Sequence, residues 1–223
     1  MMTGTPIESN VWMAYLLTVF LVVTGFAVYD ILYRRVPDRA LVFFIPLAAL
    51  APLIQVYFIL EYDRTPIFIW PVVAEALVGA LLGFCIPLAA AMATGGSGMG
   101  GGDIKFCGVL GLVYGPSGMA LVFLVACSAF FSASETAFSS LNQIRLKSRA
   151  EDGDASAARV LAMAEKYDKL LSTILIGNNI VNIAAASIGT ILFTRALGAE
   201  RGATMSTIVL TIVVLIFGEV TPK

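Results

Sequence analysis

The chain is dominated by apolar runs that are each long enough to cross a lipid bilayer as a helix. The hydrocarbon core of a bilayer is about 30 Å thick and is crossed by about 20 apolar residues of helix. Of the 223 residues, 59% are hydrophobic and only 13% are charged, whereas soluble proteins average about 25% charged residues. The sequence therefore excludes a water-soluble globular domain and predicts an all-α fold, a polytopic membrane helix bundle of about seven spans.

The seven expected spans are separated by polar or glycine-rich segments. They cover residues 11–28, 40–60, 67–92, 104–114, 119–138, 170–193 and 203–220. The fourth span is short, and the break that ends it is Gly115-Pro116-Ser117-Gly118. The N-terminal ten residues carry no positive charge before the first apolar run, so we expect that run to stay as a span and not to be a cleaved signal.

The distribution of basic residues predicts the orientation of the spans, because cytoplasmic loops next to membrane helices hold an excess of Lys and Arg. Three arginines, Arg34, Arg35 and Arg39, follow the first span, and a second basic stretch lies in residues 145–169. Both stretches are expected inside, which places the N-terminus outside.

The charge and composition also exclude some functions. The net charge of −1 means that the chain has no excess of positive charge to attract a nucleic acid, so no nucleic acid partner is expected. Histidine is absent, so acid–base chemistry depends on carboxylates.

Two aspartates are expected at the same membrane face. Asp30 ends the first span and Asp103 opens the fourth, so two crossings lie between them. Neighbouring carboxylates share a proton, which lets one act as a base toward water and the other as an acid. Gly100 and Gly102 leave room for a close backbone or an extended substrate. The alternatives are that Asp30 is an interfacial acid paired with Arg34 and that the glycines form a flexible loop.

The sequence around these aspartates resembles the type IV prepilin peptidases, which are membrane aspartyl proteases of the GxGD type. The similar strings are residues 30–37 and 98–105, within a region of about residues 11–125. The resemblance implies cleavage of prepilin-like leader peptides at the cytoplasmic face of a bacterial-type inner membrane. It makes Asp30 and Asp103 the catalytic pair, places Gly100, Gly102 and Lys105 beside the substrate, and implies no cofactor for the peptidase. The paired cysteines of the methyltransferase region are absent, so N-methylation is not expected. The last helix of the family is lost or replaced here.

A second set of polar residues lies in the last three spans. Ser128, Ser132, Glu135 and Ser139 share one helix face, because they recur at intervals of four, three and four. Asn178 and Asn182 are one turn apart, and Gly218-Glu219 lies near the end of the last span. Oxygen ligands with a carboxylate suit a hard cation such as Mg²⁺. The alternative is that the hydroxyls and amides only hold the helices together.

These residues resemble the membrane domain of the CNNM/CorC magnesium transporters. The similar blocks are residues 130–137, 176–182 and 217–223. The resemblance implies a Mg²⁺ site formed by Ser132, Asn178, Asn182, Gly218 and Glu219, with Glu135 a weaker candidate, and a homodimer. Proteins of this class continue into CBS domains, and the present sequence is expected to stop before them.

The two resemblances divide the chain at about residue 125. Residues 1–125 are interpreted as a prepilin-peptidase-like domain and residues 126–223 as a CNNM/CorC-like transmembrane domain, with the fifth span shared between them. Three function classes follow: a membrane aspartic endopeptidase, a divalent cation transport or sensing module, and a non-functional hybrid of two incomplete domains. The peptidase ranks first, because both of its acidic residues are present.

Overall fold

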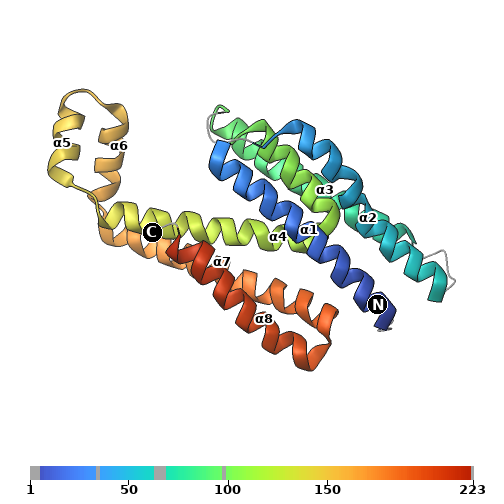
Figure 1. Ribbon diagram of the computed structural model, residues 1–223. Helices are drawn as coiled ribbons and strands as arrows, with labels where there is room; N and C mark the ends of the chain where they lie inside the picture. The colour runs from blue at the N-terminus through green and yellow to red at the C-terminus, as the bar shows by residue number, and fades with distance from the viewer. Residues whose placement is uncertain (1–5, 34–35, 63–68, 97–98, 222–223) are drawn as a thin grey trace. The chain divides into compact units, whose positions relative to one another are not determined.

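The computed structural model describes residues 6–33, 36–62, 69–96 and 99–221, and these residues form helices joined by short turns (Figure 1). The chain divides into two compact units, Met1–Ala120 and Leu121–Lys223. The helices are α1 (Pro6–Tyr33), α2 (Asp38–Tyr62), α3 (Ile69–Ala93), α4 (Gly101–Ser139), α5 (Gln143–Glu151), α6 (Ala155–Ala164), α7 (Tyr167–Leu197), α8 (Ala199–Val213) and the π-helix η2 (Val214–Val220).

The all-α polytopic prediction is confirmed, with six described helices that are long and apolar enough to cross a membrane where seven spans were expected. The difference lies in α4, where two helical segments, which correspond to the spans expected at residues 104–114 and 119–138, follow each other across a kink within 39 continuous residues. The kink is at Gly115, whose φ of 63° and ψ of −173° are not helical. A residue with a Cβ rarely adopts such a φ, so glycine at the predicted break lets the chain change direction between the two helical segments.

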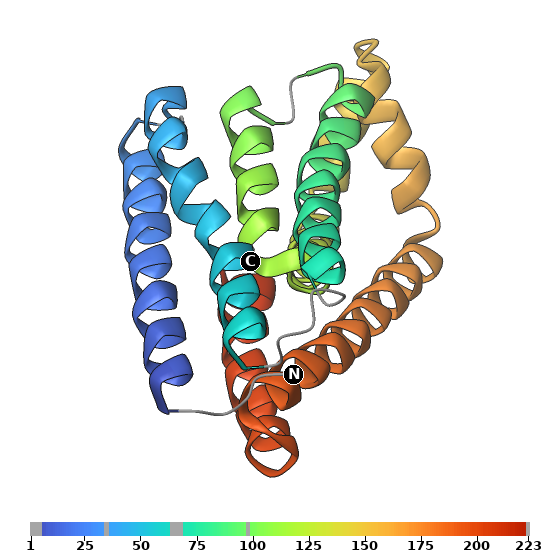
Figure 2. The same cartoon turned by 90° about the vertical axis from the view of Figure 1, so that its right-hand side faces the viewer.

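The first unit consists of α1, α2, α3 and the beginning of α4, which alternate in direction. Figure 2 shows α1 in dark blue, α2 in light blue to cyan, α3 in green and the first part of α4 in lime, each running opposite to the helix before it. The end of α1, the start of α2, the end of α3 and the start of α4 therefore lie at one end of this unit. Asp30 and Asp103 both belong to that end.

Helices α1 and α2 contribute buried apolar residues to the core of the first unit. Val19 of α1 and Phe44, Ala48 and Ala51 of α2 are all almost completely buried. The three α2 residues recur at intervals of four and three, which places them on one helix face. Many apolar side chains elsewhere in the unit are exposed, Phe43 and Trp70 among them. These apolar surfaces are expected to face lipid, because soluble monomers rarely expose many large apolar side chains together.

Helices α3 and α4 approach each other through glycines. A Cβ on Gly79 would meet the Gly111 carbonyl oxygen and would lie 2.6 Å from the Gly115 Cα. A Cβ on Gly83 would meet the Cys107 carbonyl oxygen. Small residues at four-residue spacing let membrane helices pack backbone to backbone, where van der Waals contact replaces the missing hydrophobic force. This contact fixes α4 against α3 below the end that carries Asp103.

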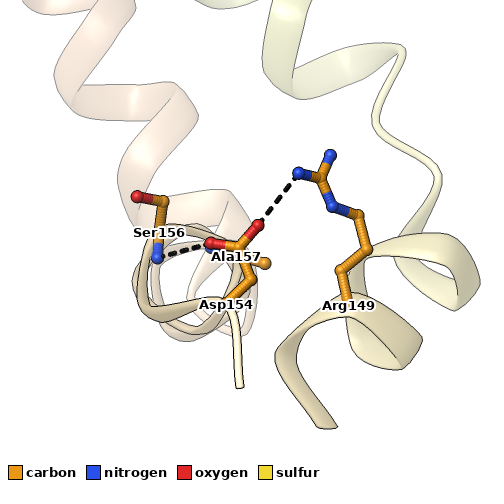
Figure 3. Close-up of polar contacts among 4 residues, drawn as sticks. All are labelled: Arg149, Asp154, Ser156 and Ala157. Atoms are coloured by element: carbon orange, nitrogen blue, oxygen red, sulfur yellow. Dashed lines mark hydrogen bonds and ion pairs between the residues drawn. The ribbon is translucent and has the colours of Figure 1, made fainter. Parts of the chain in front are cut away.

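In the second unit, the polar segment between α4 and α7 folds as the hairpin of α5 and α6. Asp154 caps α6 by accepting hydrogen bonds from the Ser156 and Ala157 amides, at 2.9 and 3.1 Å (Figure 3). Its other carboxylate oxygen lies 2.9 Å from an Arg149 guanidinium nitrogen of α5. These amide hydrogen bonds, with the guanidinium, lower the pKa of Asp154. The ionised cap therefore joins the two short helices.

Candidate functional site

Asp30 lies on α1 and Asp103 on α4, and these two helices contact each other through aromatic side chains. The aromatic residues that touch lie about one helical turn from each aspartate. The rings of Phe26 in α1 and Phe106 in α4 have centroids 5.0 Å apart, and both contact Phe44 of α2. Asp30 follows Phe26 by one helical turn and Asp103 precedes Phe106 by nearly one turn, so both aspartates are displaced toward the same end of the unit. Asp30 is exposed and Asp103 is half-buried.

The two sequence strings that contain the aspartates are in direct backbone contact. A Cβ on Gly102 would lie 2.7 Å from the Val36 carbonyl oxygen and 3.2 Å from the Val36 Cβ. Val36 follows α1 and Gly102 precedes Asp103, so the contact joins the segment after Asp30 to the helix that carries Asp103. In the described chain, the space left by the missing Gly102 side chain is therefore occupied by the backbone of Val36.

The carboxylate of Asp103 folds back over Gly100. A Cβ on Gly100 would lie 2.9 Å from Asp103 Oδ2, so the glycine leaves the space that the carboxylate occupies. Asp103 stands in the first turn of α4, where the unpaired amides and the helix dipole favour a negative charge. The Asp103 carboxylate therefore lies at the start of α4 and points back toward Gly100.

Lys105, which was expected beside the substrate, forms an ion pair within the unit. Its Nζ lies 2.8 Å from Oδ1 of Asp38, the first residue of α2, and both side chains are more than half exposed. An exposed pair of this kind contributes little stability. It connects the start of α2 to the start of α4, on the same side as the contact between Gly102 and Val36. Arg34, the alternative partner of Asp30, lies outside the described residues.

In the second unit, α4, α7 and η2 converge at Ser128. The Ser128 hydroxyl is completely buried and donates a 3.1 Å hydrogen bond to Asn178 Oδ1. A Cβ on Gly218 would lie 2.9 Å from the Ser128 Oγ, and a Cβ on Gly177 would lie 2.6 Å from the Phe131 ring. Because both glycines lack a side chain, α7 and η2 can pack closely on α4. The predicted site residues Asn178 and Gly218 are therefore brought together.

Two buried oxygens of the predicted ion site have no hydrogen-bond partner in the described chain. They are Ser132 Oγ and Asn182 Oδ1, and Ser132 is only 1% exposed. An unpaired polar atom inside a membrane protein costs free energy unless water or a ligand meets it. Both atoms are hard oxygens of the kind that Mg²⁺ accepts. The donor set therefore fits a hard cation.

Glu219 lies on the π-helix η2, half-buried, and lines a cleft together with Asn182. Short π-helical turns within α-helices occur frequently at functional sites. Among the described residues, no three Cys, Asp or Glu side chains gather into a cluster that could hold a metal. A cation here would therefore depend on hydroxyl and amide oxygens with Glu219 as its carboxylate. Glu135 is half-buried on α4, one turn beyond Ser132.

Ser128 is absent from the predicted set of site residues, although it is the centre of this convergence. The sequence did carry a signal for it, because Ser128 opens the stripe of polar residues on one face of this helix. Its bond to Asn178 depends on the register between α4 and α7, and helix periodicity alone does not fix that register.

Two family models match the chain, and they overlap at residues 119–134. The model of the type IV leader peptidase family matches residues 15–134. The model described as the Cyclin M transmembrane N-terminal domain matches residues 119–223. Both models fall in the order that the sequence motifs predicted. The predicted boundary at residue 125 lies inside their overlap and stays a prediction.

The chain is also similar to parts of longer curated proteins. It is 50% identical over 96 residues to the UPF0053 inner membrane protein YfjD of Escherichia coli, an alignment that covers 43% of this chain and 22% of that protein. It is 36% identical over 76 residues to a polyamine export protein of Escherichia coli, covering 34% of this chain and 17% of that protein.

A third relative is the prepilin leader peptidase/N-methyltransferase of Bacillus subtilis. The identity is 38% over 106 residues, which covers 48% of this chain and 35% of that protein. The chain thus spans about a third or less of these three relatives. Because the leader peptidase model matches more than half of its residues, the chain belongs to the type IV leader peptidase family, and its remaining part is similar to the Cyclin M transmembrane N-terminal domain.

Proposed function

We propose that the first half of the chain is a membrane aspartic endopeptidase that cleaves prepilin-like leader peptides, with Asp30 and Asp103 as its catalytic pair. The observation that supports this proposal is the contact of Phe26 with Phe106. Each aspartate is about one helical turn from its phenylalanine, and both lie toward the same end of the first unit. The curated prepilin leader peptidase that shares 38% identity over 106 residues supports the choice of substrate class.

The chemistry requires only the two carboxylates and water. Of two neighbouring carboxyl groups, one holds a proton and the other is ionised, because two like charges at close range are unfavourable. The ionised group accepts a proton from water as the water oxygen attacks the scissile carbonyl carbon. The protonated group then gives its proton to the departing amine, and the peptide bond is hydrolysed. No cofactor takes part in this sequence.

Cleavage of a synthetic prepilin-like leader by the purified full chain tests the proposal. The Asp103→Asn variant keeps the size of the side chain but cannot act as a base, and general acid–base groups contribute about 10²–10⁴-fold to rate. Glu75→Gln is the matched control. Glu75 is an exposed acid in the first half of α3, away from the end of the unit where Asp30 and Asp103 lie. Equal processing by the wild type and by Asp103→Asn rejects the mechanism.

The proposed setting is a bacterial inner membrane, with the N-terminus outside and the aspartates at the cytoplasmic face. Among the described residues, six apolar helices support a multi-pass arrangement in a lipid bilayer, and one relative is an inner membrane protein. Single cysteines at the two ends of α1, labelled from each side of inverted and right-side-out vesicles, test the orientation. Labelling near residue 33 from the outside contradicts it.

We propose in addition that the second half binds a divalent cation such as Mg²⁺, as transport cargo or as a sensed ligand. The orphaned oxygens of Ser132 and Asn182 favour this second function, because both are acceptors and both are buried. Ser132, Asn178, Asn182, the Gly218 backbone and Glu219 would supply the ligands. A second copy of the chain is the proposed partner.

Calorimetric titration of the purified protein with Mg²⁺ tests the second function. Glu219→Ala removes the only carboxylate of the proposed set and should abolish saturable binding, because Mg²⁺ prefers sites with at least one carboxylate. Glu165→Ala, on the exposed hairpin, is the matched control for loss of one acidic side chain. Unchanged affinity in Glu219→Ala removes the proposed site.

A further inference from the structure

The cleft between α7 and the helix pair α8–η2 extends well beyond the residues of the proposed ion site. It has a volume of about 310 Å³, whereas a single water needs only about 10–15 Å³. Asn182 and Glu219 line it, and so do hydroxyl residues that no predicted site contains. These are Thr190, Ser206, Thr207 and Thr211.

Two hydroxyl groups of this lining use their protons in hydrogen bonds to carbonyl oxygens of their own helices. Thr190 donates to the Ala186 carbonyl oxygen at 2.8 Å, and Thr207 donates to the Ala203 carbonyl oxygen at 3.1 Å. Thr190 Oγ1 lies 3.2 Å from Ser206 Oγ. With the single proton of Thr190 directed at the Ala186 carbonyl oxygen, we assign Ser206 as the donor in that pair.

The lining therefore presents hydrogen-bond acceptors with free lone pairs. Ser206 is completely buried and accepts no hydrogen bond among the described contacts. Asn182 Oδ1 is a buried acceptor with no partner among the residues that the structure describes, and Glu219 adds a carboxylate. A cavity that offers acceptors needs a ligand that supplies donors, and a negative group favours a positively charged one.

The arrangement of the hydroxyl pair is held by close helix packing. A Cβ on Gly189 would meet the Leu210 side chain, and a Cβ on Gly202 would lie 2.5 Å from the Thr194 Cα. These two contacts flank Thr190 and Ser206 along α7 and α8. Eight residues of helix separate Thr190 from Asn182, which corresponds to about 12 Å.

We propose that this acceptor-lined cleft is a second binding site, for a cation that donates hydrogen bonds through its bound waters or its ammonium hydrogens. A hydrated divalent metal ion and an alkylammonium ion share this chemistry. Thr190, Ser206 and Thr207 bind the ligand's hydrogens, and Glu219 and Asn182 connect the cleft to the proposed ion site. The inference rests on the proposed cation binding there, and it adds a site about two helical turns away.

Protection of an introduced thiol tests the cleft directly in the full chain. Thr211→Cys, in a background with the three native cysteines replaced by alanine, places a thiol at an exposed position of the lining. Ile212→Cys is the control at the same depth, since Ile212 is 52% exposed and does not line the cleft. The reagent is a methanethiosulfonate with a quaternary ammonium group, and the competitors are Mg²⁺, 1,4-diaminobutane and tetramethylammonium.

The proposal predicts that Thr211→Cys reacts faster than Ile212→Cys and that Mg²⁺ or the diamine protects it. Protection by Mg²⁺ identifies a hydrated metal ion as the ligand, and protection by the diamine identifies an alkylammonium ion. Tetramethylammonium, which is charged but donates no hydrogen bond, should not protect. Adding Ser206→Ala should raise the half-protecting concentration about tenfold, whereas Ser187→Ala, on an exposed face of α7, should not change it.

A thiol that does not react overturns the proposal, because the cleft is then closed to water. Equal protection by tetramethylammonium overturns it too, as does an unchanged half-protecting concentration after Ser206→Ala. Failure of the ion-site proposal alone has a different signature. It appears as calorimetric Mg²⁺ binding that Ser132→Ala leaves unchanged, since Ser132 belongs to the ion site and does not line the cleft, while protection of the thiol still depends on Ser206.

Discussion

Gly102 packs directly on the backbone of Val36, so that a Cβ at residue 102 would lie 2.7 Å from the Val36 carbonyl oxygen. This contact joins the segment that follows Asp30 to the helix that begins with Asp103. Two parts of the chain about seventy residues apart therefore meet at the end of the first unit where both aspartates lie. The predictions for the peptidase depend on this geometry.

Replacement of Gly102 by alanine should reduce leader cleavage. The added Cβ cannot share space with a backbone oxygen, so α4 or the segment at Val36 must move, and displacements of about 1 Å near reacting groups cost about a hundredfold in rate. Gly101→Ala is the matched control, because a Cβ there meets nothing within 4 Å. Cleavage kinetics of the two variants should differ by that factor. Equal rates would contradict the role of the contact.

Replacement of Gly79 by alanine should destabilise the first unit. Its Cβ would meet the backbone of Gly111 and Gly115, and overpacking of this kind costs about 1–3 kcal/mol. Gly25→Ala, in α1, has open space around its Cβ and should gain about 0.5–1 kcal/mol from helix propensity. Thermal unfolding in detergent, followed by circular dichroism, compares the two. A stable Gly79→Ala variant would contradict the backbone contact between α3 and α4.

Ser128 and Ser132 should respond differently to alanine substitution, although both are fully buried on α4. Ser128→Ala leaves Asn178 Oδ1 without its donor and should lower the free energy of unfolding by about 0.5–1.5 kcal/mol. Ser132→Ala removes a hydroxyl that has no partner, so it should not destabilise the metal-free protein.

Mg²⁺ titration distinguishes a ligand from an unused hydroxyl at residue 132. If Ser132 Oγ binds the cation, Ser132→Ala should weaken Mg²⁺ binding while leaving the metal-free stability unchanged. Calorimetry and unfolding on the same preparation give both quantities. Unchanged affinity in Ser132→Ala would remove this residue from the proposed site.

The junction of α5 and α6 should loosen in acid. The pKa of Asp154 is lowered, chiefly by the Ala157 and Ser156 amides, so its stabilising effect is complete above the ordinary value of 3.8 and is lost as the pH falls through the lower folded value. Amide exchange at Ser156 and Ala157, measured between pH 5 and pH 2.5 and compared with the intrinsic rate at each pH, should begin to lose its protection only below pH 3.8. Asp154→Asn should keep the cap and remove this acid dependence.

The sequence predicted those parts of the fold that hydropathy alone determines. Long apolar runs are helices in a membrane because every backbone polar group must be satisfied within the segment, and this accounts for α1, α2, α3, α7 and α8. The glycine and proline at 115–116 indicated a break at the right residue. Whether a break ends a helix or bends it depends on the packing of its neighbours, and here Gly115 lies against α3.

The site residues were predicted only as far as residue type and helix face allow. Asp30 and Asp103 could be assigned to one membrane face by counting crossings, but their neighbours could not, because the rings of Phe26 and Phe106 meet only when the helices have packed. The π-helix that carries Gly218 and Glu219 had no signal beyond a glycine and a following proline. The hydroxyl pair of Thr190 and Ser206 likewise depends on the register between α7 and α8.

The measurement that tests the central claim most directly is kcat/KM for leader cleavage by the wild type, Asp30→Asn, Asp103→Asn and the double variant. If the two carboxylates act as one unit, each single variant loses at least about 10²-fold, and the double variant loses no more than the slower single one. A double variant whose loss is the product of the two single losses, or a single variant that cleaves at the wild-type rate, would contradict the claim.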